Sequence, residues 1–209
     1  GHTVVAVAEA IPEDRLLASA DYEDAYDPHV WFDPELWAFV IEAVEAALSQ
    51  SDPGNAALFE KRAASYQRQL EAVAAWAKGR IASVPEERRV LVTSHDAYNY
   101  FGRAFEFQVV GVQGVSTATE AGIADITNTA DFIKERKIPA IFVESSVSPA
   151  TIKRISRDSG AAVGGELFSD ALGALGQLHA GSDGEQYDVG TYLGMFKYNV
   201  DTIVTALGN

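Results

Sequence analysis

A chain of 209 residues with 47% hydrophobic and 22% charged residues is long enough to bury a substantial core and too apolar to be disordered. Its formal net charge of −14 repels phosphate groups, which argues against nucleic acid as a partner and against electrostatic attachment to anionic membranes. Because there is no cysteine, disulfides and thiolate zinc sites are excluded, and any metal must be bound by histidine and carboxylate ligands.

No apolar run reaches the roughly 18 residues of a membrane span, and the first residues lack the basic and apolar regions of a signal peptide. We therefore expect a chain that is either cytosolic or already processed.

The N-terminal quarter predicts a strand, an irregular segment and a helix, in that order. Residues 4–7 form a short β-branched run, which predicts a strand that leads into a loop. An acidic, tyrosine-rich stretch at 21–27 is typical of a solvated surface, although it could also steer cations toward His29. Pro34 suits the first position of a helix with Asp33 as its cap, and apolar residues recur at helical spacing from 35 to 48.

The rest of the chain predicts one long helix followed by alternating strands and helices. Residues 56–84 would form a helix about 40 Å long, which is long enough to bridge two lobes. Beyond it, we expect strands at 89–93, 108–112, 140–143 and 161–164, and helices at 97–105, 121–136, 149–158 and 187–207. This alternation predicts an α/β fold with a mainly parallel sheet flanked by helices. The expected organisation is a small N-terminal part (1–52), a linking helix (53–84) and an α/β lobe (85–209).

Three polar residues stand where a ligand would bind to such a fold. His95 follows a predicted strand, Asp170 follows another apolar stretch, and His29 lies between Pro28 and Trp31. Parallel sheets bind ligands beyond the carboxyl ends of their strands. Two imidazoles and one carboxylate suit Zn²⁺ and also admit Mn²⁺ or Fe²⁺. The long spacing between the three residues is not a local metal motif, so on the residues alone a structural role for each histidine stays open.

Five sequence blocks occur in an order that is highly specific when they are taken together. They are Asp27-Pro28-His29-Val30-Trp31-Phe32-Asp33, Thr93-Ser94-His95-Asp96-Ala97-Tyr98, Gln113-Gly114-Val115-Ser116-Thr117, Phe142-Val143-Glu144-Ser145-Ser146, and Gly164-Gly165-Glu166-Leu167-Phe168-Ser169-Asp170-Ala171. Almost end to end, the chain resembles the cluster A-I (TroA-like) metal-binding proteins. These are the extracytoplasmic solute-binding proteins of ABC importers for zinc, manganese and iron.

The resemblance implies a role for each candidate residue. His29 would be a ligand from the N-terminal lobe, His95 a ligand from the start of the C-terminal lobe, and Asp170 the carboxylate ligand. The long helix would join the lobes and limit their hinge motion. The implied function is capture of Zn²⁺ or Mn²⁺ as cargo for a membrane permease, in the periplasm or at the cell surface and without enzymatic chemistry. Binding should weaken below about pH 6 as the histidines become protonated.

One ligand expected from the resemblance has no counterpart. The family's remaining histidine comes from an earlier part of the N-terminal lobe, and the only histidine before His29 is His2, whose context does not match the family's motif. We therefore expect a chain that lacks most of that lobe. Zn²⁺ would then have three protein ligands, and the surface normally covered by the lobe would favour association.

Other polar residues have competing interpretations. Glu144 suits either an acceptor that orients a ligand histidine or a cap for the following helix, and Asp96 suits the first of these roles. Glu120 and Glu166 are expected to be structural or solvated, and His179 to lie in a solvent-exposed loop.

The alternative from another functional class is a zinc-dependent hydrolase. It would need a free carboxylate near the metal, for which Glu144 or Glu166 could serve. No His-Glu-x-x-His motif, nucleophile elbow or phosphate-binding glycine loop supports it.

Overall fold

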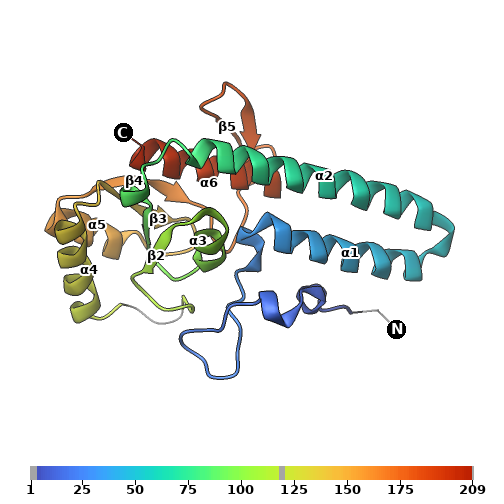
Figure 1. The fold of residues 1–209 in the computed structure, drawn as a ribbon, viewed down its shortest axis with the longest axis horizontal. Coiled ribbons are helices and arrows are strands. Elements are labelled where there is room, and N and C mark those ends of the chain that lie inside the picture. The colour runs from blue at the N-terminus through green and yellow to red at the C-terminus, as the bar shows by residue number, and fades with distance from the viewer. Residues whose placement is uncertain (1–3, 118–120, 209) are drawn as a thin grey trace.

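Four short strands form the centre of the α/β part in the computed structural model, which describes residues 4–117 and 121–208 (Figure 1). The strands are β1 (Val90–Thr93), β2 (Gln108–Gly111), β3 (Ala140–Glu144) and β4 (Ala162–Leu167). β1 pairs with β2 and β3 with β4, both in parallel, and β1 packs beside β3. The predicted α/β class with parallel strands is therefore confirmed.

The side chains of these strands alternate between two hydrophobic cores, and helices cover both faces of the strands. Val92 and Ile141 face α4 (Ile123–Arg136) and α5 (Ala150–Ser159). Leu91 and Phe142 belong to the opposite core. The helices on that side are α3 (Asn99–Phe105), α6 (Tyr192–Leu207) and the end of α2 (Ala56–Ile81).

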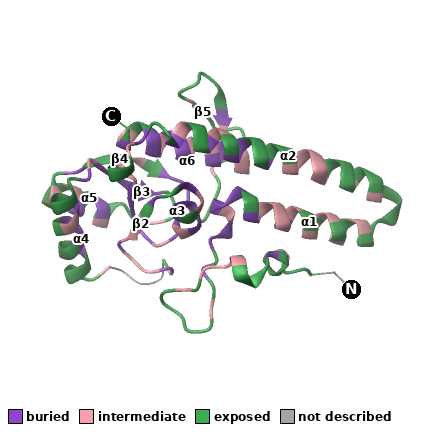
Figure 2. Ribbon diagram, in the orientation of Figure 1, coloured by how far each residue is buried: buried purple, intermediate pink, exposed green. Residues whose placement is uncertain are grey.

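α1 (Pro34–Ser51) and α2 pack against each other as a helical hairpin that extends away from the strands (Figure 1). Asp33 caps α1 as predicted, since its side chain accepts a hydrogen bond from the Glu35 N–H. The 26 residues of α2 span about 39 Å. Burial along α2 is concentrated in its second half, as the purple segments of Figure 2 show. The predicted long helix is confirmed, although it ends at Ile81, before residue 84.

One predicted element is wrong, and another begins later than predicted. Residues 4–6 form no strand and Val4 is 92% exposed, because β-branched residues favour a strand only where a neighbouring strand completes the hydrogen-bond ladder. Near the other end, an antiparallel hairpin of β5 (Leu178–Ala180) and β6 (Gln186–Asp188) occupies the start of the predicted closing helix. α6 begins only at Tyr192, where the Thr191 side chain caps it. His179 accordingly lies in β5 and not in a loop.

The remaining regular elements are single turns of 3-10 helix. They are Val7–Ala10, Glu13–Arg15, Val30–Phe32, Pro53–Asn55 and Glu86–Arg88. Within the described ranges, no helix combines the length and the hydropathy that crossing a membrane would require.

Asn199 on α6 generates a prediction about stability. Its side chain is 2% exposed; Nδ2 donates to the Phe168 carbonyl (2.7 Å) and Oδ1 accepts from the Phe168 N–H (3.0 Å). Asn199→Ala would leave a buried N–H unpaired, so we expect it to lower the free energy of unfolding by about 1–3 kcal/mol. Urea unfolding measures this, with the exposed Asn128→Ala as control, expected to change stability by less than about 0.5 kcal/mol. Equal effects of the two substitutions would contradict the prediction.

Candidate metal site

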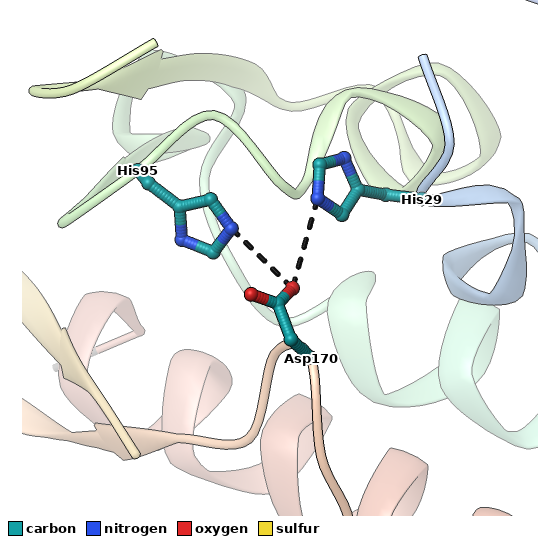
Figure 3. Close-up of side chains that lie close together, drawn as sticks. All are labelled: His29, His95 and Asp170. Atoms are coloured by element: carbon teal, nitrogen blue, oxygen red, sulfur yellow. Dashed lines mark ion pairs between the residues drawn. The ribbon is translucent and has the colours of Figure 1, made fainter. Parts of the chain in front are cut away.

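The three predicted ligands, which are far apart in the sequence, meet at one point (Figure 3). His29, His95 and Asp170 each offer a ligand atom, and these atoms lie within 4.8 Å of one another. Asp170 Oδ1 is 3.6 Å from His29 Nε2 and 3.4 Å from His95 Nε2. Ligand atoms about 2.1 Å from a tetrahedral zinc ion lie about 3.4 Å apart. The spacing therefore suits a small divalent ion, and the assignment of these residues as ligands stays a prediction.

His95 lies in the loop that leaves β1, and the loop is held by backbone and side-chain contacts. Thr93 Oγ1 donates to the His95 carbonyl (2.9 Å), and the Gln113 N–H donates to the Ser94 carbonyl (2.9 Å). The loop also crosses the end of β2 so closely that a Cβ on Gly111 would lie 2.6 Å from the backbone of the next loop residue, Asp96. Only glycine permits this approach. As a result, His95 is fully buried.

Glu144, at the carboxyl end of β3, contacts both the backbone and the ring of His95. Its Oε1 accepts a hydrogen bond from the His95 N–H (2.9 Å), and its Oε2 lies 2.5 Å from His95 Nδ1. Because Nδ1 faces Glu144, Nε2 faces Asp170. These contacts match the orienting role that the sequence left open for Glu144. The competing role as a helix cap is not seen, since α5 begins at Ala150 without a side-chain cap.

His29 is placed by a second buried carboxylate, that of Asp27. Asp27 Oδ1 lies 2.7 Å from His29 Nδ1 and also accepts a hydrogen bond from the His29 N–H (2.9 Å). Asp27 is 1% exposed, so the end of the acidic 21–27 stretch is not the solvated surface that the sequence predicted. Asp27 is a site residue that was not predicted from the sequence. The available signal was its position two residues before a histidine, from which an aspartate side chain reaches the backbone N–H.

Asp170 follows β4 in a loop that two other segments hold. Ser169 Oγ is hydrogen bonded to Ser146 Oγ (2.6 Å), and the Trp31 indole N–H donates to the Ser169 carbonyl (3.0 Å). The Asp170 side chain is 33% exposed, whereas both histidine rings are buried. A mainly apolar pocket of about 220 Å³ adjoins it, lined in part by Trp31, Trp37 and Tyr192. Asp170 is therefore the residue through which an ion from solvent would first reach the site.

Charge interactions within the site shift two pKa values. Burial lowers the pKa of His95, but the Asp170 and Glu144 carboxylates outweigh it and raise the pKa to about 9. The contact with His95 in turn holds the pKa of Asp170 below its ordinary value. Without metal, His95 is therefore protonated at neutral pH, well above the pH of about 6 expected for an ordinary histidine.

The other residues named from the sequence lie elsewhere. Glu166 is exposed on β4, and Asp96 is partly buried in the loop beside His95. His179 packs against the Tyr198 ring, with ring centroids 4.7 Å apart. Glu120 and His2 lie outside the described residues.

Comparison with known proteins gives a consistent family. Residues 1–206 match the family described as zinc-uptake complex component A, periplasmic. The chain is 44% identical over 209 residues to the zinc-binding protein TroA of Treponema pallidum, and 40% identical over 207 residues to the manganese-binding lipoprotein MntA of Bacillus subtilis. These alignments cover 98% and 97% of this chain, but the chain spans only 64% of the length of either relative.

A solved structure confirms the likeness in three dimensions. The periplasmic zinc-binding protein TroA from Treponema pallidum superposes with a TM-score of 0.90 at 43% sequence identity. The superposition covers 99% of this chain and 72% of that one.

The raised pKa of His95 predicts how the stability of the metal-free chain depends on pH. A histidine whose pKa is higher in the folded state stabilises the fold below its unfolded pKa of about 6.5, and this contribution is lost as the pH rises toward 9. We therefore expect the free energy of unfolding, measured with urea and a chelator, to fall between about pH 6.5 and 9. His95→Gln should flatten this decline, whereas His179→Gln should leave it intact. A decline that is equally steep in the His95 variant would contradict the assignment.

Proposed function

Because the chain belongs to the zinc-uptake complex component A periplasmic family, we propose that it is the metal-capturing part of an extracytoplasmic solute-binding protein. The observation that carries the proposal is the convergence of His29 Nε2, His95 Nε2 and Asp170 Oδ1 on one point. The cargo is a divalent transition metal ion, and the acceptor is the membrane permease of an ABC importer. The protein would act in the periplasm or at the cell surface.

The ligand set supports zinc or manganese as the cargo. Neutral imidazoles and a carboxylate are borderline ligands that bind Zn²⁺ tightly and also accept Mn²⁺. Both metals occur among the relatives, since TroA is named as zinc-binding and MntA as manganese-binding. In vitro affinity follows the Irving–Williams order and favours zinc over manganese whichever ion is carried. The three candidate ligands among the described residues leave at least one position for water or a further ligand.

Capture needs no covalent step. The Asp170 carboxylate, which is 33% exposed, meets the hydrated ion first. The two buried imidazoles then replace further waters, and His95 loses its proton as it binds. The two rings need little reorientation to bind the ion, because a carboxylate already contacts each Nδ1 atom. The chain's net charge of −14 attracts cations and raises their concentration near the site.

The predicted organisation into residues 1–52, 53–84 and 85–209 is part of the proposal, as is the predicted association surface. Support for the surface comes from an apolar groove between α1 and α2, to which Val44, Leu48, Phe59 and Tyr66 contribute. Val44 and Leu48 are 38% and 44% exposed, which is high for large apolar side chains at one groove.

The hydrolase alternative gains no support from the site. Glu144, its best candidate for a general base, has both oxygens engaged by His95. Glu166, the other candidate, is exposed on β4. A carboxylate in either situation is poorly placed to activate a metal-bound water.

Substitution of the ligands tests the proposal directly. We expect calorimetric titration with Zn²⁺ and Mn²⁺ at neutral pH to show saturable binding that weakens by more than about 100-fold in His95→Ala and Asp170→Ala. Loss of a ligand should exceed the 10–100-fold loss typical of an outer partner. His179→Ala, which removes a histidine from β5, should bind as the parent chain does. Equal binding by all four chains would disprove the ligand assignment.

Competition between the ion and a proton gives a second test. Because His95 is protonated below about pH 9, metal binding at its Nε2 must release a proton. The apparent affinity should therefore rise about tenfold per pH unit between pH 7 and 8. Titrations in buffers with different ionisation enthalpies should report about one proton released from this ring. Glu144→Gln removes one of the charges that raise the His95 pKa, so the metal affinity of this variant should depend less on pH. If the pH dependence of the affinity were unchanged, the Glu144 charge would not be a cause of the raised pKa.

A further inference from the structure

We propose that Asp27 is the positioning residue for His29: it selects the ring tautomer that presents Nε2 to the cargo ion, and it ties this histidine to α3. The effect on metal affinity that this inference predicts rests on the proposed function. The ring geometry itself exists without metal, so the two can be tested apart.

Asp27 is a buried carboxylate that contacts nitrogen atoms through both of its oxygens. It is 1% exposed, and burial of a carboxylate is unfavourable unless hydrogen bonds compensate for lost water. Its Oδ1 faces the backbone N–H of His29 (2.9 Å) and the ring Nδ1 of His29 (2.7 Å). Its Oδ2 accepts from Asn99 Nδ2 (3.1 Å). Two of these three contacts are with His29, so the side chain is placed to control that residue.

The contact at Nδ1 determines which ring nitrogen of His29 can bind a metal. A neutral imidazole has one N–H and one lone pair. With the proton on Nδ1, the ring donates to Asp27 and the lone pair of Nε2 points toward Asp170, 3.6 Å away. In the other tautomer, the lone pair of Nδ1 would face the carboxylate at 2.7 Å and the proton would occupy the metal-binding position. Repulsion between the lone pair and the carboxylate disfavours that form.

Asp27 also fixes His29 relative to His95. Asn99 and Tyr100 lie at the start of α3, just after the His95 loop. Asn99 binds the Asp27 side chain, and the Tyr100 hydroxyl donates to the Asp27 carbonyl (3.0 Å). The positions of both histidines are thus linked to α3, since the His95 loop leads into this helix and Asp27 is hydrogen bonded to its first residues. His29 is thus held in part through contacts of Asp27 with α3.

The arrangement at His29 repeats the one at His95. In each case, a carboxylate that is 1% exposed contacts both the backbone N–H and the ring Nδ1 of one histidine. The two carboxylates come from unrelated places, the Asp27 segment and the end of β3. The same pair of contacts occurs at both histidines although the two carboxylates come from different segments. This supports the inference that Asp27 and Glu144 share one role, which is to orient the rings.

The first experiment determines the tautomer of His29 by ¹⁵N chemical shifts of the imidazole nitrogens, in the metal-free chain at a pH where this ring is neutral. The parent chain should show the proton on Nδ1, and a proton on Nε2 would overturn the proposal before any variant is made. In Asp27→Ala, the population should shift toward the Nε2-protonated form. Asp27→Asn keeps an oxygen for the His29 backbone N–H and ring, so it should retain the parent tautomer.

The second experiment measures Zn²⁺ affinity of the same chains by calorimetry. Asp27→Ala should weaken binding by about 10–100-fold, as loss of an outer-shell partner does, and Asp27→Asn should recover most of the loss. The matched control is Asp33→Ala, which removes another buried carboxylate of the same segment; Asp33 caps α1 and is 5% exposed. It should lower stability without changing the tautomer or the affinity.

The outcomes separate the two proposals. Equal losses of affinity in Asp27→Ala and Asp33→Ala, or an unchanged tautomer in Asp27→Ala, would overturn the positioning role. If the parent chain binds no Zn²⁺, the proposed function of this chain fails, while the tautomer measurement still decides the role of Asp27.

Discussion

The site depends on one physical constraint, which is that two imidazole rings are buried with Nδ1 against a carboxylate. Ionised carboxylates are unfavourable in a protein interior unless N–H groups surround them. Asp27 and Glu144 each accept a hydrogen bond from the backbone N–H of a histidine and lie against Nδ1 of its ring. The same contacts leave Nε2 of each ring directed at Asp170. The same contacts therefore compensate for the burial of the carboxylates and orient the two candidate ligand rings.

The parallel strands make this arrangement possible. β1 and β3 pack side by side, and the carboxyl end of β3 places Glu144 against the residue that follows β1. The loop after β4 brings Asp170 to the same edge, where Trp31 and Ser146 hold its neighbour Ser169. Side chains from distant segments thus converge because parallel strands end at a common edge.

The charges of the candidate site favour the binding of either protons or a divalent cation. Asp27, Glu144 and Asp170 place three carboxylates around two imidazoles, an excess of negative charge that either protons or a divalent cation can neutralise. The raised pKa of His95 is the measurable sign of this excess in the metal-free chain. A protein with the proposed function must retain its ion and later release it, and a site whose affinity changes with protonation and with the positions of a few side chains would suit both needs.

The class of fold, the long helix and the three candidate ligands could all be predicted from the amino-acid sequence alone. Strand–helix alternation and helical spacing are local patterns, so they could be read directly for β1, α2 and their neighbours. The five blocks carried the choice of His29, His95 and Asp170, which spacing alone did not. The sequence misplaced residues 4–7 and 187–191, because a strand requires a partner that local propensity does not reveal.

How the three candidate ligands are held could not be predicted from the sequence, because it depends on contacts that form only in the folded molecule. Asp27 reads as the end of an acidic surface stretch, and Glu144 as either a helix cap or an orienting group. Their contacts with His29 and His95, and the raised pKa of His95, arise from burial and from charges brought together across the fold. Burial and proximity of this kind are properties of the packed molecule, since residues 95 and 144 become neighbours only when β1 and β3 lie side by side.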